Sequence, residues 1–448
     1  DGAMRINSLD GASSSTTDST IAVETGRETR EPPVSIALVG ALAGLVASAV
    51  MLWAGDNWGG VILPQLISDR ATIIVPLDMF RRGLEALEAN AKPSLLIGLT
   101  AAQVLAGAFI ALGYRPFARR DAAGRIVGSL VLTAGIWLFL SLVAAPLGAI
   151  GVFALDAPGD LWRTQAVFII TAVVFGATVA TLVPLPIPGR VGEDAGRRSV
   201  LWAGGMAALA IPALLATGYV GRYTRDLRRK GQVVAPTETT GEPVEGFGFA
   251  GMPPEITPTD EFYVVSKNFT DPRVNQMNWT LELSGLVDRP MSLSVTDVTT
   301  RESVEFASTL CCISNPVGGR YISTAIWQGF PLRDLLEEAG LQGGVVDIEL
   351  HAEDGYVESI PLAEALAPDT MLVHSINGEL LPDLHGAPLR LIVPNIYGMK
   401  NVKWITKIIA VDRDVQGYWQ ERGWSDVAIV ETMSRVDAPK SEAGVPVG

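Results

Sequence analysis

This 448-residue sequence contains little cysteine, little histidine and few charged residues. Its 2 Cys are the neighbours Cys311 and Cys312, and adjacent cysteines rarely pair because the disulfide geometry is strained. A disulfide scaffold and a four-cysteine zinc or iron–sulfur site are therefore excluded. The 3 His, which are His351, His374 and His385, all lie late in the chain. We therefore expect no haem within this chain.

The net charge limits which kinds of partner the protein is expected to bind. The formal net charge is -14, and charged residues make up 18% of the chain. Nucleic-acid binding depends on basic side chains that neutralise phosphates, so a nucleic-acid partner is not expected. The length fits two domains comfortably.

Long apolar runs occupy the N-terminal half. Each reaches the roughly 20 residues that a bilayer requires; they cover residues 34–54, 93–114, 126–154, 164–184 and 199–219. The third run is long enough to tilt or to include an interfacial turn at Pro146. Such runs are hard to bury in a water-soluble protein, so we predict a five-helix transmembrane domain over 34–220, with the lipid bilayer as its partner. Residues 61–90 carry charges and predict an interfacial or loop helix.

Counting the arginines beside the apolar runs barely favours one orientation in the membrane. Those in the second and fourth loops predict that these loops are cytoplasmic, whereas the basic cluster over 222–230 predicts the opposite orientation. Arg197 and Arg198 precede a mildly hydrophobic run and resemble a twin-arginine export signal. Ordinary arginine at a cytoplasmic loop is the alternative. Both interpretations place the C-terminal domain on the outer, periplasmic or extracellular, face of the cell membrane.

The remaining segments differ in composition. Residues 1–33 are polar and predict a disordered tail, 221–258 predict a linker, and 438–448 a C-terminal tail. Residues 259–437 alternate short strands with helices, which indicates an α+β domain with mixed sheets. The clearest expected elements are strands at Trp279–Leu286, Val345–His351, Leu389–Val393 and Val402–Val411, and a helix at Leu332–Ala339.

Four residues of this domain suggest chemistry. Cys312 precedes a loop rich in proline and glycine, and a thiolate is a soft ligand suited to a transition metal. A buried structural cysteine is the alternative. His385, Arg390 and Lys403 surround glycine turns in an acidic domain, and this combination suits a phosphate. Surface charge and turns are the alternative.

Four sequence blocks occur in a characteristic order. They are Phe-Tyr-Val-Val at 262–265, Cys312 followed by Ile-Ser-Asn, Ala-Ile-Trp-Gln-Gly-Phe-Pro-Leu at 325–332, and the Asn-Gly, Leu-Pro, His-Gly, Arg and Lys-Trp pattern over 377–404. Together they resemble the molybdopterin-binding domain of the sulfite oxidase family, over about 259–437. The resemblance implies an α+β mixed-sheet, sulfite-oxidase-like domain, a molybdenum–molybdopterin cofactor and an oxidoreductase.

The same resemblance implies roles for individual residues. Cys312 rather than Cys311 would bind molybdenum, because the family's ligand is followed by two residues and then Asn, as Cys312 is. The other implied cofactor contacts are Phe262, Tyr263, Val264, Lys267, His385, Arg390, Asn401, Val402 and Lys403. Beside Cys312, the catalytic candidates are Tyr321, Trp424 and, near the metal, Asp354.

Two departures from the family pattern affect the substrate. Sulfite oxidases carry arginine after that Asn, where this chain has Pro316 and Val317, and Trp424 stands where they have a tyrosine. Without that cation, binding of anionic sulfite loses its main electrostatic contribution. A neutral or weakly polar small molecule, such as a sulfoxide or an N-oxide, is therefore expected.

The combined prediction is a membrane-anchored molybdenum enzyme that performs two-electron oxygen-atom transfer. It would exchange electrons with a separate partner, either quinol-linked or a haem protein. An inactive membrane receptor or scaffold that retains the fold is the alternative, although Cys312, His385, Arg390 and Lys403 are all retained. A transporter is disfavoured because the apolar runs lack charged or broken segments.

Overall fold

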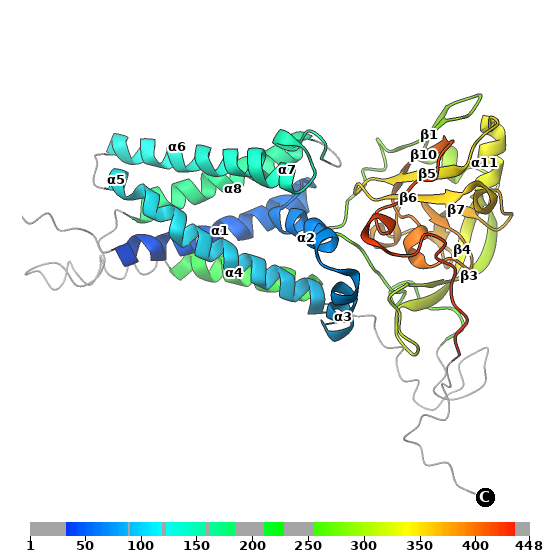
Figure 1. Cartoon of the computed structure of the whole chain (residues 1–448), viewed down its shortest axis with the longest axis horizontal. Coiled ribbons are helices and arrows are strands. Elements are labelled where there is room, and N and C mark those ends of the chain that lie inside the picture. Colours follow the sequence, from blue (N-terminus) through cyan, green and yellow to red (C-terminus); the bar gives the residue numbers. More distant parts are fainter. Residues whose placement is uncertain are drawn as a thin grey trace, which may run out of the picture.

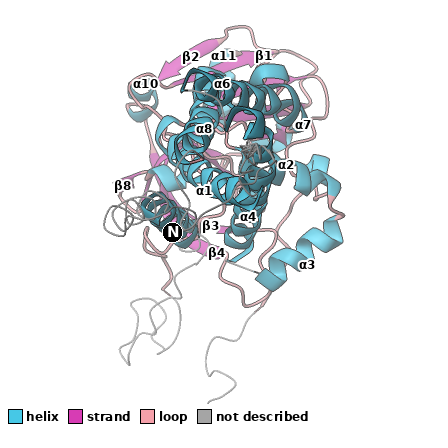
Figure 2. Ribbon diagram, turned by 90° about the vertical axis from the view of Figure 1, so that its left-hand side faces the viewer, coloured by secondary structure: helices cyan, strands magenta, loops and turns pink. Residues whose placement is uncertain are grey.

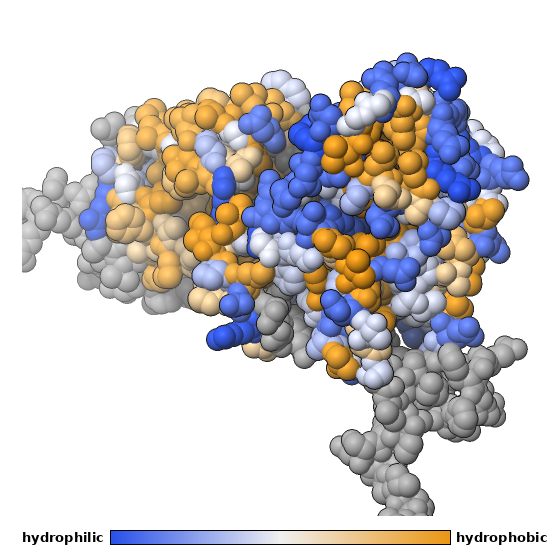
Figure 3. Space-filling model, turned by 45° about the vertical axis from the view of Figure 1, so that its right-hand side comes forward, coloured by the Kyte–Doolittle hydropathy of each residue, from blue (hydrophilic) through white to orange (hydrophobic). Residues whose placement is uncertain are grey.

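The computed structural model describes residues 33–87, 90–118, 122–157, 161–183, 210–227 and 254–434. A helical half and a strand-rich half lie end to end, with the short helices α2 (Leu63–Ile74) and α3 (Leu77–Leu87) between them (Figure 1). In Figure 3 the helical half is mostly apolar at its surface, whereas the strand-rich half is mostly polar.

The described residues contain four helices that are long and apolar enough to cross a membrane, namely Ile36–Trp58, Ala91–Phe117, Ala123–Leu147 and Leu161–Leu182. The first and last correspond to α1 (Pro33–Trp58) and α8 (Leu161–Leu182). The second comprises α4 (Ala91–Ala111), η2 (Leu112–Tyr114) and most of α5 (Arg115–Ala118), and the third comprises α6 (Ala122–Phe139), η3 (Leu140–Ala144) and α7 (Ala145–Leu147). The first four predicted runs are thus helical. The fifth is described only from residue 210, within a helix at 210–227.

Glycines allow α1 and α4 to approach closely (Figure 2). A Cβ atom on Gly40 would lie 2.4 Å from the backbone oxygen of Gly107, and one on Gly107 would lie 2.6 Å from the oxygen of Gly40. Small residues at such contacts are typical of helices that pack in membranes. Side chains such as Phe109, which is 78% exposed, face outward and are apolar. The exposed apolar surface suits lipid rather than water.

The third run contains the irregularity expected near Pro146. After α6 the helix passes through a π-helical turn, η3 (Leu140–Ala144), and a last short turn, α7 (Ala145–Leu147), before the chain reverses direction towards η4 (Val152–Ala154). Proline lacks a backbone N–H and disrupts a helix interior, so a turn at this point is its ordinary consequence.

The charged segment 61–90 forms two short helices, α2 (Leu63–Ile74) and α3 (Leu77–Leu87). Pro76 separates them, because the residue before a proline is driven out of helical conformation, and Val75 is extended at ψ 124°. With 12 and 11 residues, these two described helices are too short to be candidate spans, as predicted. The two helices lie between the helical half and the strand-rich half in Figure 1.

The strand-rich half has two five-stranded sheets. One follows the order β2-β1-β10-β5-β6, with β1 (Thr280–Gly285) parallel to β10 (Ile405–Val411) and the other pairs antiparallel. Its remaining strands are β2 (Met291–Ser294), β5 (Asp347–Ala352) and β6 (Val357–Pro361). The α+β domain with a mixed sheet is therefore confirmed.

The second sheet is antiparallel and carries residues of the site. It has the order β3-β4-β7-β8, with β9 paired to β7; the strands are β3 (Val304–Cys311), β4 (Ile322–Pro331), β7 (Met371–Ile376), β8 (Glu379–Leu380) and β9 (Arg390–Ile392). The helical segments are α10 (Val295–Thr299), α11 (Leu332–Ala339), α12 (Leu362–Ala365), η5 (Asp383–His385), η6 (Gly398–Lys400) and η7 (Gln420–Arg422). α11 matches its predicted bounds and ends at Gly340, whose φ of +74° suits glycine.

Several predictions fall outside the described residues. These are the predicted tail at 1–33 except Pro33, which begins α1, the tail at 438–448, and the arginine pair of the export signal. Most of the predicted linker at 221–258 also lies outside, but its first residues, 221–227, are helical and continue the helix that begins at residue 210.

Candidate active site

A cavity of about 1520 Å³ lies between the strand-rich half and the helical half. It exceeds the roughly 300–1,000 Å³ of an ordinary small-molecule pocket, so it has room for a cofactor and a substrate together. Every candidate side chain named from the sequence lines it: Phe262, Tyr263, Val264, Lys267, Cys312, Tyr321, Asp354, His385, Arg390, Asn401, Val402, Lys403 and Trp424. The fold thus brings together residues that are up to 162 positions apart, from Phe262 to Trp424.

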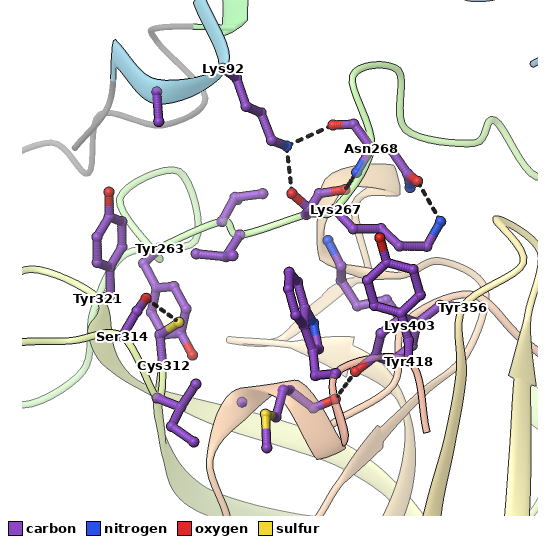
Figure 4. Close-up of a pocket in the computed structure, with 18 of the residues that line it drawn as sticks. Lys92, Tyr263, Lys267, Asn268, Cys312, Ser314, Tyr321, Tyr356, Lys403 and Tyr418 are labelled. Carbon is purple, nitrogen blue, oxygen red and sulfur yellow. Dashed lines mark hydrogen bonds between the residues drawn. The ribbon is translucent and has the colours of Figure 1, made fainter. Parts of the chain in front are cut away.

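Cys312 directly follows β3 and begins a loop that returns into β4. Its backbone N–H donates to the oxygen of Tyr321 at 2.9 Å, and its Sγ lies 3.2 Å from Ser314 Oγ. Figure 4 shows Cys312, Ser314, Tyr263 and Tyr321 together on one side of the cavity. Burial raises the pKa of the Cys312 thiol, although hydrogen bonds from Ser314 oppose this effect. A bound metal cation would favour the thiolate.

Cys311 has a different environment. It is 2% exposed and its Sγ lies 3.6 Å from the oxygen of Cys312. It is the last residue of β3, and only Cys312 of the two lines the cavity. The geometry therefore supports the preference for Cys312 as the ligand.

Arg390 on β9 lies buried against the cavity. Its Nη1 donates to the oxygen of His385 at 3.0 Å, its Nη2 donates to the oxygen of Asn401 at 3.3 Å, and its guanidinium lies 5.0 Å from the ring centroid of Trp327. Its Nε is buried and has no hydrogen-bond partner among the residues that the structure describes. Burial lowers the pKa of Arg390 to about 10, which still leaves it a cation at neutral pH. A buried cationic donor without an acceptor suits an anionic ligand.

Two lysines extend this basic side of the cavity (Figure 4). Lys403 Nζ donates to the oxygen of Leu384 at 3.2 Å, and burial lowers the pKa of Lys403 to about 8. Lys267 Nζ donates to Asn268 Oδ1 at 2.9 Å. A Cβ atom on Gly386, whose φ is +110°, would lie 2.9 Å from Lys403 Cβ, so glycine is needed for this loop to approach the lysine.

His385 is held as a neutral ring. Its Nε2 donates to the oxygen of Thr259 at 3.0 Å, which leaves Nδ1 without a proton in the neutral form. Burial, assisted by the positive charge of Arg390, lowers the pKa of His385 to about 4. His385 can therefore accept a hydrogen bond through Nδ1 but contributes no charge at neutral pH.

Asp354 lies with the lysines. Its carboxylate is 3.9 Å from Lys267 Nζ and accepts from Asn268 Nδ2 at 2.7 Å, and Lys267 also donates to its backbone oxygen at 3.0 Å. Figure 4 places Lys267 across the cavity from Cys312. These contacts support a role in orienting Lys267 more directly than the expected role near the metal.

Trp424 places an indole in the cavity wall, with its ring centroid 6.1 Å from that of Trp419. Its Nε1 is buried, and no acceptor lies within hydrogen-bond distance of it in the described part of the chain. A donor in this state suits an oxygen atom of a ligand.

Sequence reasoning did not single out several cavity residues. Tyr356 and Tyr418 lie beside the lysines in Figure 4. The hydroxyl oxygen of Tyr356 lies 3.0 Å from Glu358 Oε2 and 2.8 Å from the oxygen of Met399. Tyr356 follows Asp354 by two positions, so the motif around Asp354 could have indicated it. Arg320 is an exposed cation beside Tyr321 and also lines the cavity, and its charge was the available signal.

Comparison with known proteins identifies the family. Residues 268–419 match the family described as oxidoreductase molybdopterin binding domain. The Bacillus subtilis (strain 168) protein named uncharacterized oxidoreductase YuiH is 32% identical over 173 residues, which are 39% of this chain and 85% of that protein. The chain belongs to the sulfite oxidase family of molybdopterin oxidoreductases. It is therefore an oxidoreductase with a molybdenum–molybdopterin cofactor, as the sequence predicted.

Larger members of the sulfite oxidase family match over the same region. Mitochondrial sulfite oxidase of Drosophila melanogaster is 31% identical over 42% of this chain and 36% of its own length. Nitrate reductase [NADH] 1 of Arabidopsis thaliana is 30% identical over 42% of this chain and 23% of its own length. The chain thus spans about a third or less of these two relatives. The sulfane dehydrogenase SoxCD from Paracoccus pantotrophus aligns with 26% identity and a TM-score of 0.34, over 36% of this chain and 45% of that one.

The cavity fits the family's cofactor. Within the described ranges the buried Arg390 Nε has no partner, and Lys267 and Lys403 add positive charge across the cavity from the Cys312 thiol. Cys312 would ligate molybdenum, while Arg390, Lys403 and Lys267 would hold the anionic pterin and its phosphate.

Proposed function

We propose that this chain transfers oxygen between water and a neutral small molecule such as a sulfoxide or an N-oxide. The observation that carries the proposal is one cavity in which the Cys312 thiol lies near an aromatic and apolar wall while most of the cationic groups lie opposite. When bound, the molybdenum cofactor supplies two-electron oxygen-atom chemistry. The protein positions the cofactor, orients the substrate and limits water in the cavity.

The groups near Cys312 suit a neutral substrate oxygen. Val317 is apolar and 68% exposed where sulfite oxidases carry a cation, and Tyr321 supplies a hydroxyl to the cavity. Elsewhere in the cavity wall, beside Trp419, the Trp424 Nε1 has no acceptor among the described residues and is a neutral donor. An S–O or N–O oxygen is a strong acceptor, so neutral donors can orient it without a net charge on the substrate.

An anion such as sulfite is the second candidate, and Arg320 favours it. This residue is exposed, lines the cavity and precedes Tyr321. It could supply the positive charge that Pro316 and Val317 do not.

Steady-state assays separate the two candidates. Reduced benzyl viologen should be oxidised in the presence of dimethyl sulfoxide or trimethylamine N-oxide, whereas ferricyanide should not be reduced rapidly by sulfite. Fast sulfite oxidation that falls at least tenfold in Arg320→Gln would reverse this order. An inactive scaffold would show neither reaction even with about one molybdenum per chain.

We further propose that residues 34–220 anchor residues 259–437 at the outer face of the membrane, after twin-arginine export, and that a quinol-linked or haem protein exchanges electrons with the enzyme. The four apolar helices and the position of the arginine pair support this arrangement. Protease added to sealed cells should cleave the catalytic domain. Cleavage only after lysis would place that domain inside.

A further inference from the structure

The helical half forms part of the cavity wall. Residues from α2, the α2–α3 junction, α3, the start of α4 and the helix at 210–227 all line the same cavity as Cys312 and Arg390. We define the apolar members of this wall as the roof: Val75, Met79, Phe80, Leu87, Leu95 and Leu227.

Direct contacts hold the roof against the catalytic domain. Tyr418 donates to Asp69 Oδ1 at 2.8 Å, and Arg422 Nε donates to Thr72 Oγ1 at 3.0 Å. The ring centroids of Phe80 and Trp419 are 6.4 Å apart. These contacts fix α2 and the start of α3 over the cavity.

A second set of contacts involves the start of α4 and α2. Lys92 Nζ donates to the oxygen of Asn268 at 2.6 Å, and Gln65 Oε1 accepts from the backbone N–H of Phe269 at 2.8 Å. Figure 4 shows Lys92 reaching from its helix to the strand-rich half, where Asn268 and Lys267 lie. The segment that carries Lys267 is therefore held by the helical half as well.

The roof differs chemically from what the cofactor requires. The pterin and its phosphate are polar and anionic, and Arg390, Lys267 and Lys403 on the domain side match them. The roof offers aliphatic, aromatic and thioether side chains instead, and Met79 remains 64% exposed. The roof also lies at the end of helices able to cross a membrane, where an amphiphilic molecule would partition.

From this arrangement we infer that the substrate is amphiphilic, with an oxygen-bearing head directed to the Cys312 side and a hydrocarbon portion lying against the roof. The inference rests on the proposed function and specifies its substrate class. For a sulfoxide the reaction breaks the S–O bond, and the sulfur is reduced to a thioether. The oxygen leaves as water with two protons, and two equivalents of a one-electron donor such as reduced viologen supply the electrons.

The test uses the full, molybdenum-loaded chain in lipid nanodiscs with reduced benzyl viologen. Dimethyl, butyl methyl and methyl octyl sulfoxides form the substrate series. Burial of each methylene against the roof should raise kcat/KM about fourfold until the roof is covered. Phe80→Ala should reduce the ratio of kcat/KM for methyl octyl sulfoxide to that for dimethyl sulfoxide at least tenfold.

Ile74→Ala is the matched control. Ile74 is an apolar residue at the end of α2, is 77% exposed and does not line the cavity. It should keep the wild-type ratio. Partitioning into lipid alone would favour the long chain equally in wild type, Phe80→Ala and Ile74→Ala, so equal ratios in all three would overturn the inference. Molybdenum content and gel filtration confirm that each variant is folded.

A redox-inert probe separates this inference from the proposed function. Calorimetric titration with methyl octyl sulfone should show tighter binding than with dimethyl sulfone, and Phe80→Ala should remove most of the difference. Failure of every sulfoxide and N-oxide to react would overturn the proposed function. Sulfone binding that is independent of chain length, or unchanged in Phe80→Ala, would overturn the roof as a binding surface.

Discussion

The two walls of the cavity differ in how they are built. The domain wall carries buried cations and a thiol on loops held by hydrogen bonds, such as those from Arg390 to the oxygens of His385 and Asn401. The helical wall carries apolar side chains from the α2–α3 segment, the start of α4 and the end of the helix at 210–227, all outside the matched family region of 268–419. The difference indicates that cofactor binding belongs to the shared domain, whereas the helical half shapes what else can enter.

The largest expected effect is on the domain wall. Cys312→Ser removes the soft ligand, so molybdenum content and turnover should fall at least about 100-fold. This loss exceeds the roughly 10- to 100-fold effect of altering residues that only contact the metal ligands. Elemental analysis beside activity measures this. Cys311→Ser, a buried neighbour, should retain molybdenum. An equal loss of molybdenum in both variants would mean that Cys312 is not the specific ligand.

The next effect concerns the basic side. Lys403→Met removes a cation expected to contact the phosphate, and a charged hydrogen bond contributes about 1.5–3 kcal/mol. Cofactor affinity should therefore fall about 10- to 100-fold, measured as pterin released during gel filtration. Lys407→Met is the control, because Lys407 is half exposed on β10 and pairs with Glu282 at 3.2 Å. Similar release from both variants would contradict a specific role for Lys403.

The stability of the catalytic domain should depend on pH through His385, the neutral group beside the cations of the domain wall. The pKa of His385 falls from 6.5 to about 4 on folding, so the unfolded chain binds this proton more readily. Its contribution to stability is complete above about pH 6.5 and is lost as the pH falls towards about 4, by up to about 3 kcal/mol. Chemical denaturation of the cofactor-free protein at several pH values measures this loss. His385→Gln should flatten the profile in that window, and an unchanged slope would contradict the assignment.

The smallest effect is at the junction between the walls. Tyr418→Phe removes the hydrogen bond to Asp69 and should destabilise the junction by about 1 kcal/mol. Hydrogen exchange in α2 should then be several-fold faster. Combining this variant with Asp69→Asn should give less than the sum of the single effects. Additive effects would show that the two residues act independently.

Much of the catalytic domain could be predicted from short-range patterns. α11 could be predicted because its apolar residues recur at helical spacing and Gly340 ends it. Cys312 could be identified as a candidate ligand because this thiol precedes a proline- and glycine-rich loop. The glycine turns around His385, Arg390 and Lys403 indicated a phosphate site, and the resemblance to the family added the other cofactor contacts; all of these residues line the cavity. The length and apolar composition of the first four runs likewise determined their helices.

Tertiary structure alone decided which groups face one another across the cavity. The ion pair of Lys267 with Asp354 and the contact of Phe80 with Trp419 join residues 87 and 339 positions apart. No local pattern encodes such pairs, because propensity and periodicity act over a few turns of chain. Sequence therefore determined the elements and the chemistry of the thiol and the cations. The packing of the helical half on the catalytic domain decided that the cavity has an apolar roof, because side chains distant in sequence can meet only once both surfaces are formed.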